Sequence, residues 1–177
     1  MPRIPYVPAE LAEPAALVEA IRKRRGGKLT QLDRLLLHSP PLAAAWNTYL
    51  GAVRTQLSLA PKIRELAICG VAVLNGAEYE FFHHAPLFAQ AGGTQAQVEA
   101  LRDFDRAADS ILFDATERAV IRLTLAITRD VKVKDATFAA ARAALPDEQA
   151  IVELVATIAT YNLVSRFLVA FEVTAQQ

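Results

Sequence analysis

The sequence has 177 residues, of which 53% are hydrophobic and 21% are charged. This length suits one domain with a sizeable core, and so hydrophobic a composition favours further burial between subunits. The 19 Lys and Arg residues balance the 19 Asp and Glu residues, which argues against binding to nucleic acid or to a membrane surface. The single cysteine, Cys69, excludes an intramolecular disulfide, a four-cysteine zinc site and a CxxC redox pair.

The N-terminal residues are rich in proline and lack the basic start and apolar run of a signal peptide. We therefore expect an extended arm over residues 1–13, a single domain over residues 14–177, and a cytoplasmic location. Residues 151–173 are apolar enough to span a bilayer, but polar and charged side chains occur along their length. We interpret this stretch as a buried helix of a soluble protein.

Ala, Leu, Glu and Arg are abundant, Gly occurs only 7 times, and no stretch alternates apolar and polar residues over a strand length. The sequence therefore predicts an all-α fold. Thr30, Thr94 and Asp114 are candidate N-caps, and Pro14 and Pro61 suit first helical turns. With glycine and proline stops, these signals predict helices near residues 14–26, 30–39, 42–57, 61–76, 78–93, 94–104, 114–130, 135–145 and 146–173.

The helix expected over residues 61–76 carries no charge between Leu66 and Leu74, so it belongs in the middle of a bundle. Asn75 and Gly76 form a tight break after it. The helix that follows is therefore its antiparallel partner.

Two polar residues stand within the apolar stripe of that partner helix. Glu80 and His84 are four residues apart and share one face, while Glu65 shares a face of the preceding helix with Cys69. Such groups are costly in a core unless they pair or serve a cavity, and a glutamate–histidine cluster can transfer protons near neutral pH. We expect the three to meet at a partly enclosed pocket. The spacing equally allows a structural helix pair, with Glu65 only favouring a helix N-terminus.

The segment RELAICGVAVLNGAEYEFFHH at residues 64–84, followed by AQAGGTQAQVEAL at 89–101, resembles the signature of the carboxymuconolactone decarboxylase and alkylhydroperoxidase D superfamily. Residues 35–46, 117–141 and 153–173 are also similar to decarboxylase-like members. The resemblance implies that superfamily's helical bundle, with a central antiparallel helix pair and a long C-terminal helix. It also implies a homo-oligomer, either a trimer or a hexamer.

The peroxidase branch has a glutamate, then a CxxC pair, then a histidine one turn further on. In this chain Glu65 stands at the glutamate position and His84 at the histidine position. Ala77 and Glu80 stand where the two cysteines would be. The redox pair is missing, so disulfide-forming peroxidase chemistry should be missing too, and we interpret Cys69 as a core residue. The chain resembles instead the decarboxylase branch, whose named reaction removes carbon dioxide from a γ-lactone acid in aromatic catabolism.

The resemblance implies that His84 donates or accepts the proton, and that Glu65 and Glu80 set its protonation and orientation. Arginine suits the binding of a substrate carboxylate, although each arginine could equally form a surface or interface ion pair. His83 is either a second imidazole of the site or a capping or interface group. The candidate substrate-binding residues are Arg64, Arg54, Arg166, His83, Tyr79, Tyr161 and Asn162.

We therefore expect a lyase that needs no cofactor and acts on a small carboxylated intermediate. We expect no metal, because neither HExxH nor a cysteine-based ligand spacing is present. Redox enzymes and decarboxylases share this fold, which leaves two alternatives open. One is an alkylhydroperoxidase-like antioxidant protein with peroxiredoxin activity, and the other is a non-catalytic oligomeric protein that binds a small ligand.

Overall fold

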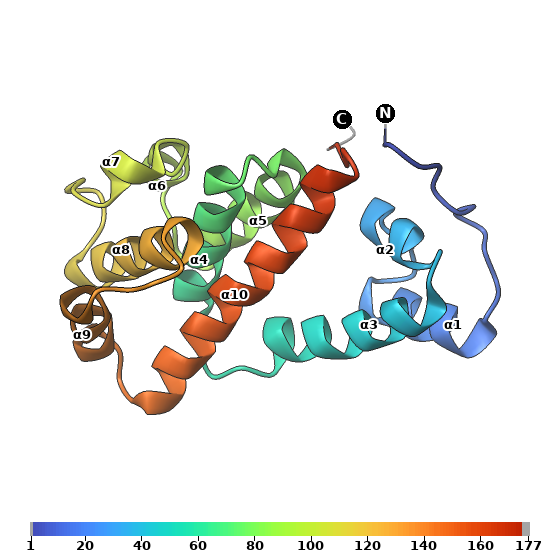
Figure 1. The fold of residues 1–177 in the computed structure, drawn as a ribbon, viewed down its shortest axis with the longest axis horizontal. Coiled ribbons are helices and arrows are strands. Elements are labelled where there is room, and N and C mark those ends of the chain that lie inside the picture. The colour runs from blue at the N-terminus through green and yellow to red at the C-terminus, as the bar shows by residue number, and fades with distance from the viewer. Residues whose placement is uncertain (1, 175–177) are drawn as a thin grey trace. The chain divides into compact units, whose positions relative to one another are not determined.

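The computed structural model describes residues 2–174, which contain ten helices and no strand, so the all-α prediction is confirmed. These residues form two compact units (Figure 1). Residues 2–57 and 170–174 make up the first unit, and residues 58–169 make up the second. This division into two units does not test the single domain predicted over residues 14–177, which stays a prediction.

The first unit contains α1 (Ala15–Arg24), α2 (Gln31–Leu36) and α3 (Pro40–Thr55), and α3 packs against both other helices. Thr30 caps α2 as predicted, because its side chain accepts from the Asp33 N–H while the Asp33 carboxylate accepts from the Thr30 N–H. Helix α3 begins two residues earlier than predicted. Its two prolines occupy the first turn, where no N–H is needed.

The second unit is built around α4 (Pro61–Leu74), which packs against α5 (Glu78–Gln90) and α8 (Ala115–Arg129). Gly76 has a φ of +67°, a conformation that glycine adopts without strain, and it closes the turn between α4 and α5. The middle of α4 is fully buried, as its lack of charge predicts. The remaining helices of this unit are α6 (Gln95–Ala100), α7 (Phe104–Ala107), α9 (Asp135–Ala144) and α10 (Glu148–Ala170).

Two further boundaries differ from the prediction, and a side-chain cap explains each of them. The helix predicted over residues 94–104 ends at Ala100, and a separate helix, α7, follows with the Asp103 side chain as its cap. The last helix begins at Glu148, because the carboxylate of Asp147 accepts a hydrogen bond from the Ala150 N–H. Aspartate ahead of a helix is a preferred N-cap, so both signals were present in the sequence.

Helix α10 is long and apolar enough to cross a membrane, but 61% of its most apolar window is buried inside the protein. Polar side chains of this helix form hydrogen bonds within the second unit. Glu153 accepts a hydrogen bond from the Leu59 N–H at 2.8 Å, and Asn162 donates to the Thr128 hydroxyl at 3.0 Å. These contacts support the interpretation of α10 as a buried helix rather than a membrane span.

Gly70 permits the close contact between α4 and α7. A Cβ atom at this position would lie 2.1 Å from the Cζ atom of Phe104, whose side chain is itself buried. We expect Gly70→Ala to lower the free energy of unfolding by about 1–3 kcal/mol, because the ring and the helices must move apart. Urea unfolding followed by circular dichroism measures this effect.

Gly51→Ala in α3 is the matched control, since a Cβ there would meet only the Arg24 Cδ atom at 3.6 Å. This change should be neutral or stabilising by up to about 1 kcal/mol, because alanine favours helix more than glycine does. Equal effects of the two substitutions would contradict the packing argument.

Candidate functional site

Helices α4 and α5 bring Glu65 and His84 into direct contact. Glu65 lies one turn after Pro61, and the turn at Gly76 runs α5 back along α4, so that residues 19 apart in sequence meet. The Nδ1 atom of His84 lies 2.6 Å from the Oε2 atom of Glu65. The two side chains are almost fully buried, with exposed fractions of 5% for His84 and 3% for Glu65. A strong, water-shielded hydrogen bond therefore joins the two central helices.

Glu65 is the ionised member of this site. Burial by itself would raise its pKa, but the hydrogen bond and charge of His84, together with Arg64, outweigh burial and hold the pKa below its usual range. The Nε atom of Arg64 lies 3.2 Å from the second carboxylate oxygen. An ionised carboxylate only accepts hydrogen bonds, so the Nδ1 of His84 carries the hydrogen. The proton that His84 can exchange is then on Nε2.

The pKa of Glu80 is shifted in the opposite direction from that of Glu65. It lies one turn before His84 on α5 with 2% of its surface exposed, and neither carboxylate oxygen has a hydrogen-bond partner within the described residues. Burial raises the pKa of this carboxyl well above its usual range. Burial therefore favours the protonated form of Glu80, which lies one turn from His84 without a hydrogen bond to it.

Cys69 lies one turn after Glu65 on α4 and is fully buried. Burial, and then the charges of Glu65 and Glu80, raise the pKa of its thiol. The thiolate, which is the reactive form of cysteine, is therefore disfavoured. Its position agrees with the prediction of a core residue.

The predicted aromatic residues are divided between two places. The ring of Tyr161 on α10 meets His84 edge-on at a centroid distance of 5.0 Å, which adds Tyr161 to the site. The ring of Tyr79 instead packs against His83 at 4.4 Å, and His83 also contacts Phe82. The exposed His83 is therefore not brought together with Glu65 and His84.

Asn162 is engaged in contacts between helices. It donates to Thr128, its Oδ1 accepts from the Asn75 amide at 3.0 Å, and Arg166 donates to both its carbonyl and its side chain. Arg54 lies in α3, in the other unit. The substrate-binding roles of Asn162, Arg166 and Arg54 stay predictions.

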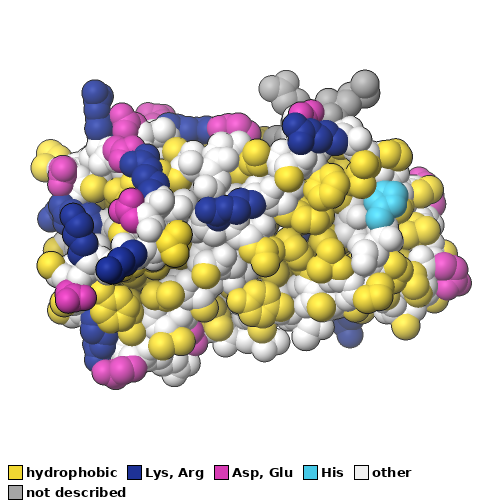
Figure 2. Space-filling model, viewed as in Figure 1, with side chains coloured by type: hydrophobic (Ala, Val, Ile, Leu, Met, Phe, Trp, Pro, Cys, Tyr) yellow, Lys and Arg dark blue, Asp and Glu magenta, His cyan; other side chains and the backbone are white. Residues whose placement is uncertain are grey.

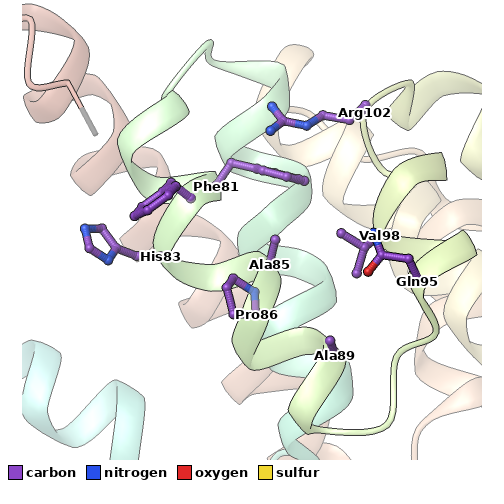
Figure 3. A pocket seen from close by; sticks show the side chains of 9 residues that line it. Phe81, His83, Ala85, Pro86, Ala89, Gln95, Val98 and Arg102 are labelled. Carbon is purple, nitrogen blue, oxygen red and sulfur yellow. The ribbon is translucent and has the colours of Figure 1, made fainter. Parts of the chain in front are cut away.

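A groove lies beside this site, between α5 and α6 (Figure 3). It has a volume of about 550 Å³, and His83 is the one predicted site residue among those that line it. Glu65, Glu80 and His84 do not line it, so it is not the pocket expected around those three. Within residues 2–174, no group of three or more His, Cys, Asp or Glu side chains is placed to hold a metal ion.

The sequence analysis did not single out Arg102, which lies at one end of this groove. Its guanidinium stacks on the ring of Phe81, with the Cζ atom 3.8 Å from the ring centroid. Arg102 follows the end of α6 in a segment without a motif, so only the packing of that segment against α5 identifies it.

Residues 40–111 match the profile of the Carboxymuconolactone decarboxylase family, a stretch that contains Glu65, Glu80 and His84. This segment of the chain is similar to that family. Among curated proteins, no sequence matches this chain significantly. Several solved structures resemble this chain in fold. Their sequence identity to it is too low for their activities to be assigned to this chain.

Three of these structures cover most of the chain. A protein of unknown function from Agrobacterium tumefaciens, linked by name to the antioxidant defence protein AhpD, is 19% identical, with a TM-score of 0.73 over 81% of this chain and 96% of that one. An uncharacterised peroxidase-related protein from Silicibacter sp. TM1040 is 16% identical, with a TM-score of 0.80 over 98% and 90%. The debrominase Bmp8, solved with 2,3,4-tribromopyrrole, is 17% identical, with a TM-score of 0.75 over 99% and 94%.

The pKa of Glu65 is lowered and that of Glu80 is raised, so replacing each by glutamine should have opposite effects on stability. The folded pKa of Glu65 is lowered, so its contribution to stability is present above the unfolded pKa of about 4.3 and is lost as pH falls through the folded pKa. Glu65→Gln should therefore lower the melting temperature at neutral pH, and the loss should shrink in acid.

The folded pKa of Glu80 is raised above the unfolded value of about 4.3. The free energy of unfolding is therefore highest with respect to this group below that value, and it falls as pH rises and the buried carboxyl must ionise. Glu80→Gln should therefore gain stability over the unmodified protein as pH rises from about 4 toward neutral and beyond. Melting curves across this pH range measure both variants. If both show the same pH profile, the assigned charge states are wrong.

Proposed function

We propose that this chain is a cofactor-independent enzyme that decarboxylates a small carboxylated lactone and supplies the proton that replaces carbon dioxide. The observation that carries the proposal is the buried Glu65–His84 pair at 2.6 Å, with the buried carboxyl of Glu80 one turn away. The similarity of residues 40–111 to the carboxymuconolactone decarboxylase family supports the choice of substrate class.

Decarboxylation requires one proton and no redox partner. The carbon–carbon bond to an ionised carboxylate breaks, carbon dioxide leaves, and the electron pair stays on the ring carbon, in conjugation with the lactone carbonyl. One proton must then be delivered to that carbon. A group that keeps its proton at neutral pH and is shielded from water suits this step.

Burial raises the pKa of Glu80 and shields its carboxyl from water, so we assign it the role of proton donor. Glu65 holds His84 through Nδ1, and we assign the exchange of a proton with the substrate to the other ring nitrogen, Nε2. Glu65 is a positioning residue in this scheme, because it acts through His84. Arg64, beside Glu65, supplies positive charge next to the cluster.

The antioxidant alternative has weaker support. Two of the similar structures are connected by name with antioxidant defence or peroxidases, but their similarity concerns the fold. Cys69 has no second cysteine with which to form an intramolecular disulfide, and its buried thiol resists ionisation. These two properties oppose a thiol-dependent peroxidase cycle.

We also propose that the protein acts in the cytoplasm as a homo-oligomer. Helix α10 exposes large apolar side chains, including Val152, Leu163 and Val169. In Figure 2, hydrophobic side chains are spread between the charged ones on the face along which α10 runs. Exposed apolar side chains of this size favour burial against another copy of the chain.

His84→Ala should lower turnover of carboxymuconolactone by roughly 10²-fold or more, the scale of a positioned proton transfer, while the helical circular dichroism signal persists. Glu80→Gln, which cannot donate a carboxylic proton, should cause a similar loss. Carbon dioxide release measures both variants. His38→Ala is the matched control, because this exposed histidine lies in the first unit and bonds to the Pro5 carbonyl.

If His84→Ala spares turnover and lowers only the melting temperature, the pair is structural. Thiol-dependent peroxide turnover that is lost in Cys69→Ser would instead favour the antioxidant alternative. Full turnover by Glu80→Gln would remove Glu80 from the proton-donor role.

Light scattering should give the mass of a trimer or a hexamer at micromolar concentration. Leu163→Asp should lower that mass, because it places a charge on the exposed apolar side of α10, where burial of an unpaired charge is costly. A monomeric unmodified protein would contradict the oligomer, and an unchanged mass in Leu163→Asp would exclude this side of α10 from the interface.

A further inference from the structure

We propose that the groove between α5 and α6 is a second binding site, which takes a small organic monoanion with an apolar body. Its volume of about 550 Å³ lies within the range of small-molecule sites. All of the residues that line it belong to the second unit. The proposal does not depend on the function proposed for the Glu65–His84 site.

The two walls of the groove are mostly apolar. Figure 3 shows Ala85, Pro86 and Ala89 along α5, facing Val98 and Gln95 of α6 across the hollow. The short side chains on α5 leave room for a ligand to lie against the helix. Such walls favour an apolar ligand body, with polar recognition restricted to a few points.

Arg102 is the main polar group in the groove. Among the side chains that line the groove, it is the one Lys, Arg, Asp or Glu residue, and it lies at one end (Figure 3). Stacking on Phe81 at 3.8 Å and a hydrogen bond to the Glu78 carboxylate at 2.8 Å hold its guanidinium in place. A guanidinium has five N–H donors, of which the bond to Glu78 uses one.

A preorganised guanidinium at the end of an apolar groove is complementary to a carboxylate on an apolar body. Guanidinium binds carboxylate through two parallel hydrogen bonds, and the rest of the ligand would lie along Ala85, Pro86 and Val98. Glu78 does not prevent this, because its side chain is 70% exposed and can move into solvent. Charge complementarity therefore selects an organic monoanion over a neutral or cationic ligand.

The site is separate from the Glu65–His84 pair. His84 is buried against Glu65 of α4, whereas none of Glu65, Glu80 and His84 is among the residues that line the groove. A ligand in the groove would touch none of Glu65, Glu80 and His84. Binding in the groove and turnover at His84 can therefore fail independently.

Titration calorimetry with 3-phenylpropionate and its neutral analogue 3-phenylpropanol tests the proposal on the full chain. The acid should bind saturably, and the alcohol should bind at least about 10-fold more weakly, since it lacks the charge-assisted hydrogen bonds. Arg102→Gln should weaken binding of the acid by a similar factor. Val98→Trp should abolish binding by filling the groove, with circular dichroism and melting curves confirming that both variants fold.

Arg106→Gln is the matched control, because this arginine is exposed, pairs with Asp103 and does not line the groove. It should bind the acid as the unmodified protein does, and so should His84→Ala. The proposal is overturned by any of four results: no saturable binding, equal binding of acid and alcohol, unchanged binding in Arg102→Gln, or loss of binding in His84→Ala alone. An oligomer that Val98→Trp dissociates, without any binding of the acid, would identify the groove as a contact between copies and also overturn it.

Discussion

The hydrogen bond between His84 and Glu65 joins the two helices on which the second unit is built. Helix α4 is buried from Glu65 to Ala72, so a polar group in this stretch must find a partner inside the protein. The turn at Gly76 brings α5 back along α4 and provides that partner. The same contact lowers the pKa of Glu65 and places the hydrogen of the pair on Nδ1 of His84. Fold and candidate chemistry therefore depend on one interaction.

Two glutamates in one buried region differ because their partners differ. Glu65 has the imidazole of His84 and the guanidinium of Arg64 beside it, and these offset the cost of burying its charge. Within the described residues Glu80 has no hydrogen-bond partner, and burial raises its pKa. Pairs of carboxyl groups with separated pKa values are a common basis for acid–base catalysis. Here the separation follows from the packing of α4 against α5.

Helix α10 completes the site without carrying one of its charges. Tyr161 places a ring against His84, while Asn162 and Glu153 tie the helix to its neighbours by hydrogen bonds. A buried polar group with its partners in place specifies a position, because any displacement leaves donors or acceptors unpaired. The polar residues that argued against a membrane span in the sequence therefore hold Tyr161 over the site.

Local signals in the sequence determined the helices and the order in which they occur. Thr30, Thr94 and Asp114 cap α2, α6 and α8 as predicted, because a cap acts within four residues of itself. The missed boundaries at Asp103 and Asp147 are caps of the same kind. Helical spacing also placed Glu80 and His84 on one face, since that relation depends only on the 3.6-residue repeat.

Only the tertiary structure decided which side chains pair. Both Glu80 and Glu65 were candidates to bond His84, and the distance across α4 and α5 selects Glu65. The packing of α5 also turns His83 outward, and that of α6 places Arg102 over Phe81 at the end of a groove. Hydrogen bonds and charge states change over fractions of an ångström between helices, whereas the sequence specifies distances only along each helix.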